Sequence, residues 1–250
     1  MHPKAMILCI LAIITLPLFA DDPHRLKTEF QDVPPKYLVE KGVPSGLSYE
    51  IMKLIEKKSG YTFVYQDKLV PLARVSKNLE DGITDIQFGI QKTSERERSM
   101  IFGPILYKVK LIGVMRKDDA AEILSLPELV EQKAVVLTQY GTGAAASLKT
   151  VSGLVVDDHA TSVDMNIQKL LAGRGKIIIY HNLTLNYVIR ASKYKEQLKM
   201  VELNFGTVTE FVDIGQYLVY AKKTPQHVMD DINQAVRDAS DNGELQSITD

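Results

Sequence analysis

The chain has 250 residues, 45% of them hydrophobic, and its 30 basic and 31 acidic side chains leave a net charge of −1. This length allows one large domain or two small ones with a substantial core. Acidic and basic residues are interspersed, so the composition excludes the basic face that a nucleic-acid-binding protein needs.

The first 20 residues have the layout of a secretory signal peptide. Lys4 precedes an apolar run over 5–19, and the small residue Ala20 is followed by two acids. Because the run is shorter than the ~20 residues of a membrane span, we expect cleavage after Ala20, with a retained N-terminal anchor as the alternative. The only cysteine, Cys9, lies in this segment, which excludes a disulfide scaffold and thiolate chemistry from the mature chain.

Predicted strands and helices alternate through the rest of the chain. A polar, proline-marked segment over 21–42 is interpreted as a short strand plus loop. Leu47, Ile51, Leu54 and Ile55 then share one helical face and predict a helix that ends at Gly60. Further strands are predicted over 61–66, 84–90, 108–117, 134–139, 153–157, 176–181 and 215–223. Further helices are predicted over 71–82, 124–132, 141–149, 162–174, 183–192 and 225–240.

This alternation predicts an α/β fold with mostly parallel sheets. One strand–helix–strand run spans roughly 26–105, another roughly 120–205, and a strand–helix pair is left over after 210. If that pair returns to the first unit, the chain forms two lobes joined by two crossings, with a cleft between them. We therefore expect a signal peptide over 1–20, a first lobe over 21–110, a second lobe over 111–210 and a return to the first lobe over 211–250.

Enzymatic motifs do not appear in the sequence. It has no GxSxG, HExxH, phosphate-binding or dinucleotide-binding pattern. The mature histidines are scattered without ligand spacing, so we expect no metal, no cofactor and no catalytic residue. The polar run Asp157-Asp158-His159 is interpreted as a solvated loop after a strand.

The strongest binding candidate follows the strand predicted over 84–90. Gly89, Gln91, Thr93 and Arg96 follow its segment TDIQF, at the kind of sheet edge that ligands favour. Glycine allows a close approach, threonine can cap a helix, and arginine offers a planar fork that matches a carboxylate. The alternative is that Arg96 pairs with a neighbouring acid on the surface.

Two more candidates follow later strands. Gly141 and Thr142 lie where a helix begins, and free amides at a helix start attract anions, although Thr142 could simply cap the helix. Tyr180 and His181 end a strongly apolar strand, and His181 could equally be a helix-start or loop residue.

A set of short patterns occurs in a specific order. They are Gly46-Leu47-Ser48-Tyr49-Glu50; Leu79, Gly82 and Asp85; Thr93 and Arg96 followed by Phe102, Gly103, Pro104 and Tyr107; Gly141-Thr142; and Leu170, Gly173 and Arg174. In this order the chain resembles, over essentially its whole mature length, the periplasmic solute-binding proteins of ABC importers, in the polar-amino-acid-type family with the type II fold.

The resemblance implies a two-lobed receptor that closes about a hinge and is not an enzyme. Arg96 would take the carboxylate of the ligand, supported by main-chain groups near Gly89 and Gln91 and by the Thr93 hydroxyl. Thr142 would reach across from the other lobe. The expected location is the periplasm, and the expected partner is an ABC permease, with the receptor a monomer.

The sequence departs from the family where the ammonium of an amino acid would be held. Family members usually place an acid there, whereas this chain has His181 with Tyr180 beside it. With Arg74 and Arg96 as further cationic candidates, we expect a small polar ligand that bears a carboxylate, such as an organic acid. The alternatives are a sensing partner of a membrane signalling protein and a dehydratase-like enzyme on the same fold.

Overall fold

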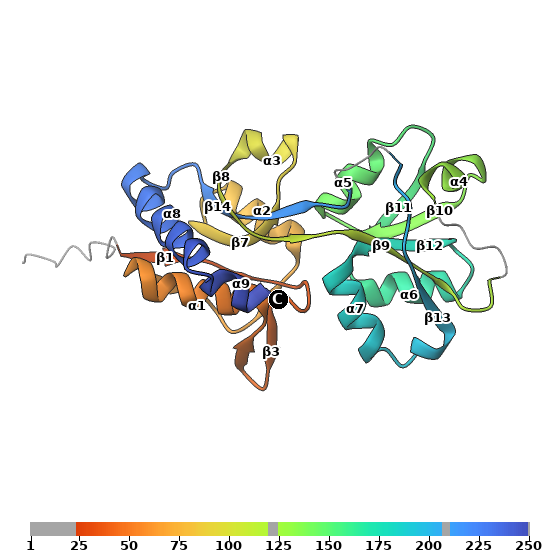
Figure 1. Ribbon diagram of the computed structural model, residues 1–250, viewed down its shortest axis with the longest axis horizontal. Coiled ribbons are helices and arrows are strands. Elements are labelled where there is room, and N and C mark those ends of the chain that lie inside the picture. Colours follow the sequence, from red (N-terminus) through yellow and green to blue (C-terminus); the bar gives the residue numbers. More distant parts are fainter. Residues whose placement is uncertain (1–23, 120–124, 207–210, 250) are drawn as a thin grey trace, which may run out of the picture.

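A computed structural model describes residues 24–119, 125–206 and 211–249, so the predicted signal peptide lies outside the described residues. The elements gather into two bodies that lie side by side and are joined by extended strands (Figure 1). One body holds the beginning and the end of the described chain, and the other holds its middle.

The first body, called lobe 1, is built on a three-stranded antiparallel sheet in the order β7-β14-β8. Two parallel pairs, β1-β5 and β2-β6, and the antiparallel hairpin β3-β4 complete its strands. The strands are β1 Arg25–Lys27, β2 Phe30–Gln31, β3 Leu38–Glu40, β4 Val43–Ser45, β5 Thr62–Val64, β6 Leu69–Val70, β7 Ile86–Gln91, β8 Met100–Val109 and β14 Ile214–Ala221. The helices are α1 Leu47–Ser59, α2 Leu72–Glu80, α3 Ser94–Ser99, α8 Gln226–Asp241 and α9 Glu244–Thr249.

The second body, called lobe 2, is built on one five-stranded sheet in the order β11-β10-β12-β9-β13. Its strands are β9 Leu111–Arg116, β10 Val135–Gln139, β11 Val155–Ala160, β12 Ile177–His181 and β13 Leu198–Val201. Its helices are α4 Leu126–Glu131, α5 Gly143–Lys149, α6 Val163–Leu171, α7 Asn182–Ala191 and the short 3-10 turn η1 Lys195–Gln197.

Strand direction differs from the sequence-based prediction of mostly parallel sheets. In lobe 2 only β10 pairs in parallel with β11 and β12, whereas β9 runs antiparallel to both β12 and β13. Strand β9 enters lobe 2 directly from lobe 1, because only Lys110 separates it from β8. No helix connects these two strands, so β9 is not part of a strand–helix–strand unit that would make it parallel to its neighbours. Strand β14 returns antiparallel to β8, with Ile214 opposite Val109. The result is an α/β fold with mixed sheets.

Apolar helix faces build the cores, as the periodicity predicts. On α1 the side chains of Ile51, Met52 and Ile55 are fully buried, and the helix ends at Gly60 in the left-handed region, with φ 74°. The polar run over 157–159 is predicted to be a loop but lies within β11, where the backbone pairs with β10. Within the described ranges, no helix combines the length and apolarity that crossing a bilayer requires.

Candidate functional site

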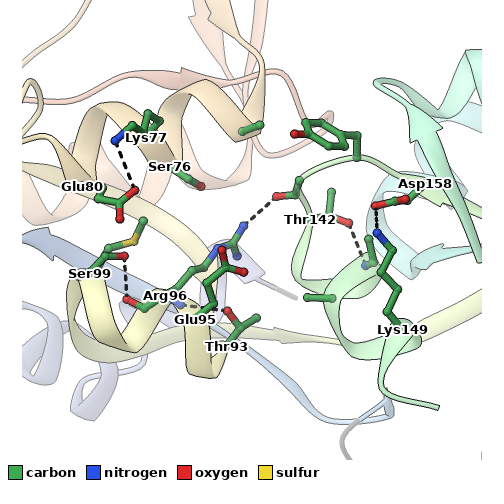
Figure 2. A pocket seen from close by; sticks show the side chains of 16 residues that line it. Ser76, Lys77, Glu80, Thr93, Glu95, Arg96, Ser99, Thr142, Lys149 and Asp158 are labelled. Carbon is green, nitrogen blue, oxygen red and sulfur yellow. Dashed lines mark hydrogen bonds and ion pairs between the residues drawn. The ribbon is translucent and has the colours of Figure 1, made fainter. Parts of the chain in front are cut away.

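The carboxyl end of β7 lies at the boundary between the two lobes, and Arg96 holds it there. Arg96 is 9% exposed, and its Nη1 donates to the carbonyl oxygen of Gln91 at 2.9 Å. Its Nη2 donates to the carbonyl oxygen of Gly141 in lobe 2, also at 2.9 Å (Figure 2). The guanidinium therefore joins main-chain groups of both lobes.

Local capping explains how the two neighbouring helices begin. The Thr93 hydroxyl accepts from the amide of Arg96 at 3.3 Å and starts α3, which places Arg96 in the first turn. The Thr142 hydroxyl accepts from the amide of Ala145 at 3.1 Å and donates to the carbonyl of Gln139 at 2.7 Å. Both threonines are helix caps, so their hydroxyls position the site and are already hydrogen bonded.

Gln91 forms the second bridge between the lobes. Its Oε1 accepts from Nε2 of His181 at 3.2 Å, and its Nε2 donates to the Ser147 hydroxyl at 3.3 Å. A side chain at Gly143 would press on Gln91, because a Cβ atom there would lie 2.4 Å from its Cδ. Glycine at 143 thus lets the Gln91 side chain fit against the start of α5.

The two residues at the end of β12 are buried. His181 is 3% exposed and stacks on Tyr180, with the two ring centroids 4.7 Å apart. Burial, with the nearby charges of Lys36 and Arg96, lowers the pKa of His181 well below its ordinary value, so the imidazole is neutral at neutral pH. Burial raises the pKa of Tyr180, which also stays neutral. Neither residue supplies a positive charge.

Lys36, which sequence reasoning places inside a loop, brings the second buried charge. Its ammonium donates to the carbonyl of Gly89 at 2.8 Å and to Oε1 of Gln216 at 2.6 Å. Lys36 is 4% exposed, and burial, with the charge of Arg96, lowers its pKa to about 7. The carbonyls of Pro35 and Lys36 accept the first amides of α1, which fixes this segment against the helix.

Gly89 adopts a conformation that other residues rarely adopt. Its φ is 81°, and a Cβ atom there would lie 2.6 Å from the Tyr107 hydroxyl and 2.9 Å from the Ser48 hydroxyl. Its neighbours Phe88 and Ile90 face consecutive residues of β14, so Gly89 is the extra residue of a bulge. The bulge breaks the regular pairing of β7 where Lys36 makes its contact.

Residues 25–250 match the sequence family of bacterial extracellular solute-binding proteins, family 3. The chain belongs to this family. A search of curated proteins found no match to the chain.

Solved structures with a similar fold agree with this membership. An ancestral arginine-binding protein bound to arginine has a TM-score of 0.74 at 20% identity, covering 90% of this chain and 96% of that chain. The amino acid ABC transporter substrate-binding protein AbpA from Streptococcus pneumoniae, bound to L-arginine, has a TM-score of 0.73 at 19% identity, covering 90% and 92%. The ancestral amino acid-binding protein AncCDT-1, a precursor of cyclohexadienyl dehydratase, has a TM-score of 0.71 at 17% identity, covering 90% and 93%. These likenesses show the two-lobed type II periplasmic binding protein fold.

Two open clefts flank the buried cluster of this family 3 solute-binding protein. One, of about 410 Å³, lies between α2, α3 and the start of α5, and Arg96 and Gly141 line it (Figure 2). The other, of about 520 Å³, lies beside Gln91 and Ser147. The lobes meet between these two clefts, and Arg96 lies where one of the clefts reaches that contact.

The structure brings most of the predicted binding residues of the solute-binding protein together, with one exception. Seven of them lie at the lobe boundary, and Gly89 lies on the lobe 1 side beside Lys36. The seven are Gln91, Thr93, Arg96, Gly141, Thr142, Tyr180 and His181. Arg74 instead lies exposed on α2, outside the buried group. Among the described residues, no cluster of three or more His, Cys, Asp or Glu side chains could hold a metal ion.

Lys36 and Gln216 belong to the buried polar cluster but were not predicted from the sequence. Lys36 follows two prolines in a polar segment, a context in which lysine is usually exposed. Gln216 interrupts the apolar strand IGQYLVYA, and a buried polar residue inside such a strand is a signal that could have been used.

Proposed function

We propose that this solute-binding protein binds a small carboxylate-bearing solute between its lobes, with Arg96 as the group that holds the carboxylate. The observation that carries the proposal is the burial of a guanidinium that contacts main-chain carbonyls from both lobes. No ion pair joins Arg96 to a carboxylate in the part of the chain that the structure describes. A buried charge is costly unless it is paired, and a carboxylate pairs more strongly with guanidinium than a carbonyl does.

On this proposal, the bound solute replaces contacts that the two lobes make with each other. When the lobes part, Arg96 loses the Gly141 carbonyl and its Nη2 becomes free for an anion. Gln91 also loses His181 and Ser147. A solute that replaces these contacts favours the closed arrangement, so its binding shifts the population toward closure. We propose the same division of the chain, with lobe 1 over 21–110 and 211–250 and lobe 2 over 111–210.

The biological setting follows the family. The family of extracellular solute-binding proteins supports a location in the periplasm, a monomeric receptor and delivery of the solute to an ABC permease. A receptor that reports its bound state to a membrane sensor would use the same site, and a pull-down of membrane proteins with solute-loaded chain separates the two roles.

An enzyme on the same fold is the second candidate, because one similar structure is a precursor of a dehydratase. The binding-only proposal predicts no turnover of cyclic acids by the pure protein. Turnover that is lost in Arg96→Ala would favour the enzyme instead.

The decisive variant for the receptor proposal is Arg96→Ala. We expect a loss of affinity for small carboxylates of at least about 30-fold, since truncating one member of a buried charge pair costs about 2–5 kcal/mol. Arg96→Lys should weaken binding as well, because an ammonium lacks the planar fork. Calorimetric titration of a panel of small carboxylates and amino acids measures both effects.

Arg98→Ala is the matched control, because Arg98 is exposed on the same helix. The proposal is contradicted if Arg96→Ala, still folded by circular dichroism, binds as tightly as the wild type. Native mass spectrometry of the purified chain identifies any solute that co-purifies.

A further inference from the structure

Two buried cations lie along one short stretch of β7. The ammonium of Lys36 contacts the carbonyl of Gly89, and the guanidinium of Arg96 contacts the carbonyl of Gln91. Gly89 and Gln91 are two residues apart, which separates their Cα atoms by at most about 7 Å. The two charged groups therefore lie within the span of one small molecule.

Neither cation forms an ion pair among the residues that the structure describes, although the charge of Glu95 acts on Arg96. Both donate to neutral oxygen atoms, and no described ion pair includes either of them. Two positive charges close together in the interior repel each other and are poorly solvated. An anion that met both of them would remove that cost, and a single carboxylate held by Arg96 would leave Lys36 unpaired.

An ammonium group of a ligand would find no free negative partner beside Lys36 and His181. Lys36 donates to Gly89, and its own charge would repel a second ammonium at the same place. His181, which is neutral and lies beside Gln91, offers no negative charge. The arrangement thus disfavours the ammonium group of an α-amino acid.

Hydrogen-bond donors remain free beside Lys36. Its two acceptors use two of the three ammonium protons. The side chain of Gln216 is fully buried, and its Nε2 has no partner in the described part of the chain. Gln216 pairs with Gln91 across β14 and β7, and its Oε1 accepts from Lys36, so this free donor lies beside the Lys36 ammonium.

We propose that Lys36 is a second anion-binding residue and that the solute is a small dianion without an ammonium group. One carboxylate binds Arg96, and a second acidic group, carboxylate or phosphate, binds Lys36 with the Gln216 amide. This inference rests on the proposed receptor function and adds the class of solute to it.

Calorimetric titrations at pH 6.5 with five probes test the inference. Succinate and phosphoglycolate carry two acids, butyrate carries one, and glutamate and glutamine add an ammonium. We expect succinate or phosphoglycolate to bind at least about 30-fold more tightly than butyrate and than either amino acid. The preferred member of the first two probes identifies the second acid as carboxylate or phosphate.

Lys36→Met should abolish the preference for the dianion and leave the affinity for butyrate within about 3-fold. Lys36→Gln keeps a donor for the Gly89 carbonyl without the charge, and it gives the same test if the methionine variant does not fold. Lys68→Met is the matched control, because Lys68 is an exposed lysine of the same lobe.

The outcomes separate the inference from the receptor function. Equal binding of butyrate and the dianions, a preference that survives in Lys36→Met, or tighter binding of an amino acid overturns the inference. The receptor function stands in each of those cases, provided that Arg96→Ala loses the bound probe. Failure of all five probes to bind the folded wild type counts against both.

Discussion

A single lysine sets the charge of the site near neutral pH. The ionisable groups around Lys36 are Arg96, His181, Tyr37, Tyr107 and Tyr180. Arginine remains charged, burial keeps the histidine neutral, and burial raises the pKa of each of the three tyrosines. Within this group Lys36, with a pKa of about 7, is therefore the residue that changes charge between pH 6 and 9.

The folded chain without solute should gain stability as pH rises from about 7 toward 10.5. The pKa of Lys36 is about 7 in the folded chain and 10.5 ordinarily, so in this window the unfolded chain binds a proton that the folded chain does not. Below pH 7 both states are protonated and the cost of the buried charge is complete. Urea unfolding of wild type and Lys36→Met across pH 6–10 measures the effect. A difference between the two chains that stays constant with pH would contradict it.

Arg96 and Lys36 differ in how far their place in the site can be predicted from the sequence. Arg96 is predictable because it follows a strand within a Thr-x-x-Arg pattern. The burial of Lys36 is not predictable from the sequence. The segment after β2 packs against the start of α1, and Lys36 then contacts Gly89 of β7, which is distant from it in sequence. Arg74, which the family resemblance offers as a further cationic candidate, is exposed on α2.

At the level of elements, Gly89 shapes the end of β7 because it breaks the regular pairing of this strand with β14. The bulge and the left-handed backbone bring the Gly89 carbonyl to Lys36, while Ser48 and Tyr107 close over the glycine from α1 and β8. The shape of this strand end thus depends on the absence of a side chain.

Gly89→Ala should destabilise the chain by more than the roughly 1–3 kcal/mol that a strained backbone alone costs. The added methyl group would lie 2.6 Å from the Tyr107 hydroxyl, so the neighbours must move as well. Gly42→Ala is a close control, because Gly42 has φ 79° and a methyl group added to it would have no atom within 4 Å. Chemical unfolding compares the two variants, and equal losses would show that the contacts around Gly89 are unimportant.

Helix limits and caps are predictable from the sequence, whereas strand direction is not. The periodicity and Gly60 predict α1, and Thr93 and Thr142 are both caps, as their positions allow. Apolar patterns do not carry strand direction, so the antiparallel β7-β14-β8 sheet could not be inferred. The first part of β8 escapes prediction because Gly103 and Pro104 resemble a break. Proline is accommodated there because β8 is an edge strand, and glycine lets Asn233 of α8 approach.

At the level of the whole molecule, a few polar contacts hold the lobes together. Arg96 reaches Gly141, and Gln91 reaches His181 and Ser147. Hydrogen bonds of this kind contribute about 0.5–1.5 kcal/mol each, so the closed arrangement is weakly held without solute. The order of the elements predicts two lobes and a cleft. The contacts between the lobes could not be predicted, because they join residues that are distant in sequence and share no local pattern.

Gly143→Ala should open the chain. A methyl group at 143 would displace Gln91 and break its contacts with the other lobe, while the backbone at 143 needs no positive φ. We expect a larger radius of gyration by small-angle X-ray scattering and a weaker affinity for carboxylates. Gly173→Ala, which strains the backbone of lobe 2 at φ 72° but would place its methyl group within 4 Å of no atom, controls for a general loss of stability. An unchanged scattering profile for Gly143→Ala would contradict the role of these contacts in closure.

If Arg96 holds the solute as we propose, the Gly141 carbonyl, which accepts from its Nη2, competes with that solute. The competitor is tethered, so it acts at an effective concentration fixed by the geometry of the lobes. A neutral solute with an amide group offers the guanidinium an acceptor that is no stronger than the Gly141 carbonyl. A solute with an ionised acid offers it a stronger, charge-assisted hydrogen bond. On the proposed function, the contact between Arg96 and Gly141 therefore disfavours the binding of neutral molecules. The acceptor is the main-chain carbonyl of residue 141, so a substitution at this position does not remove it.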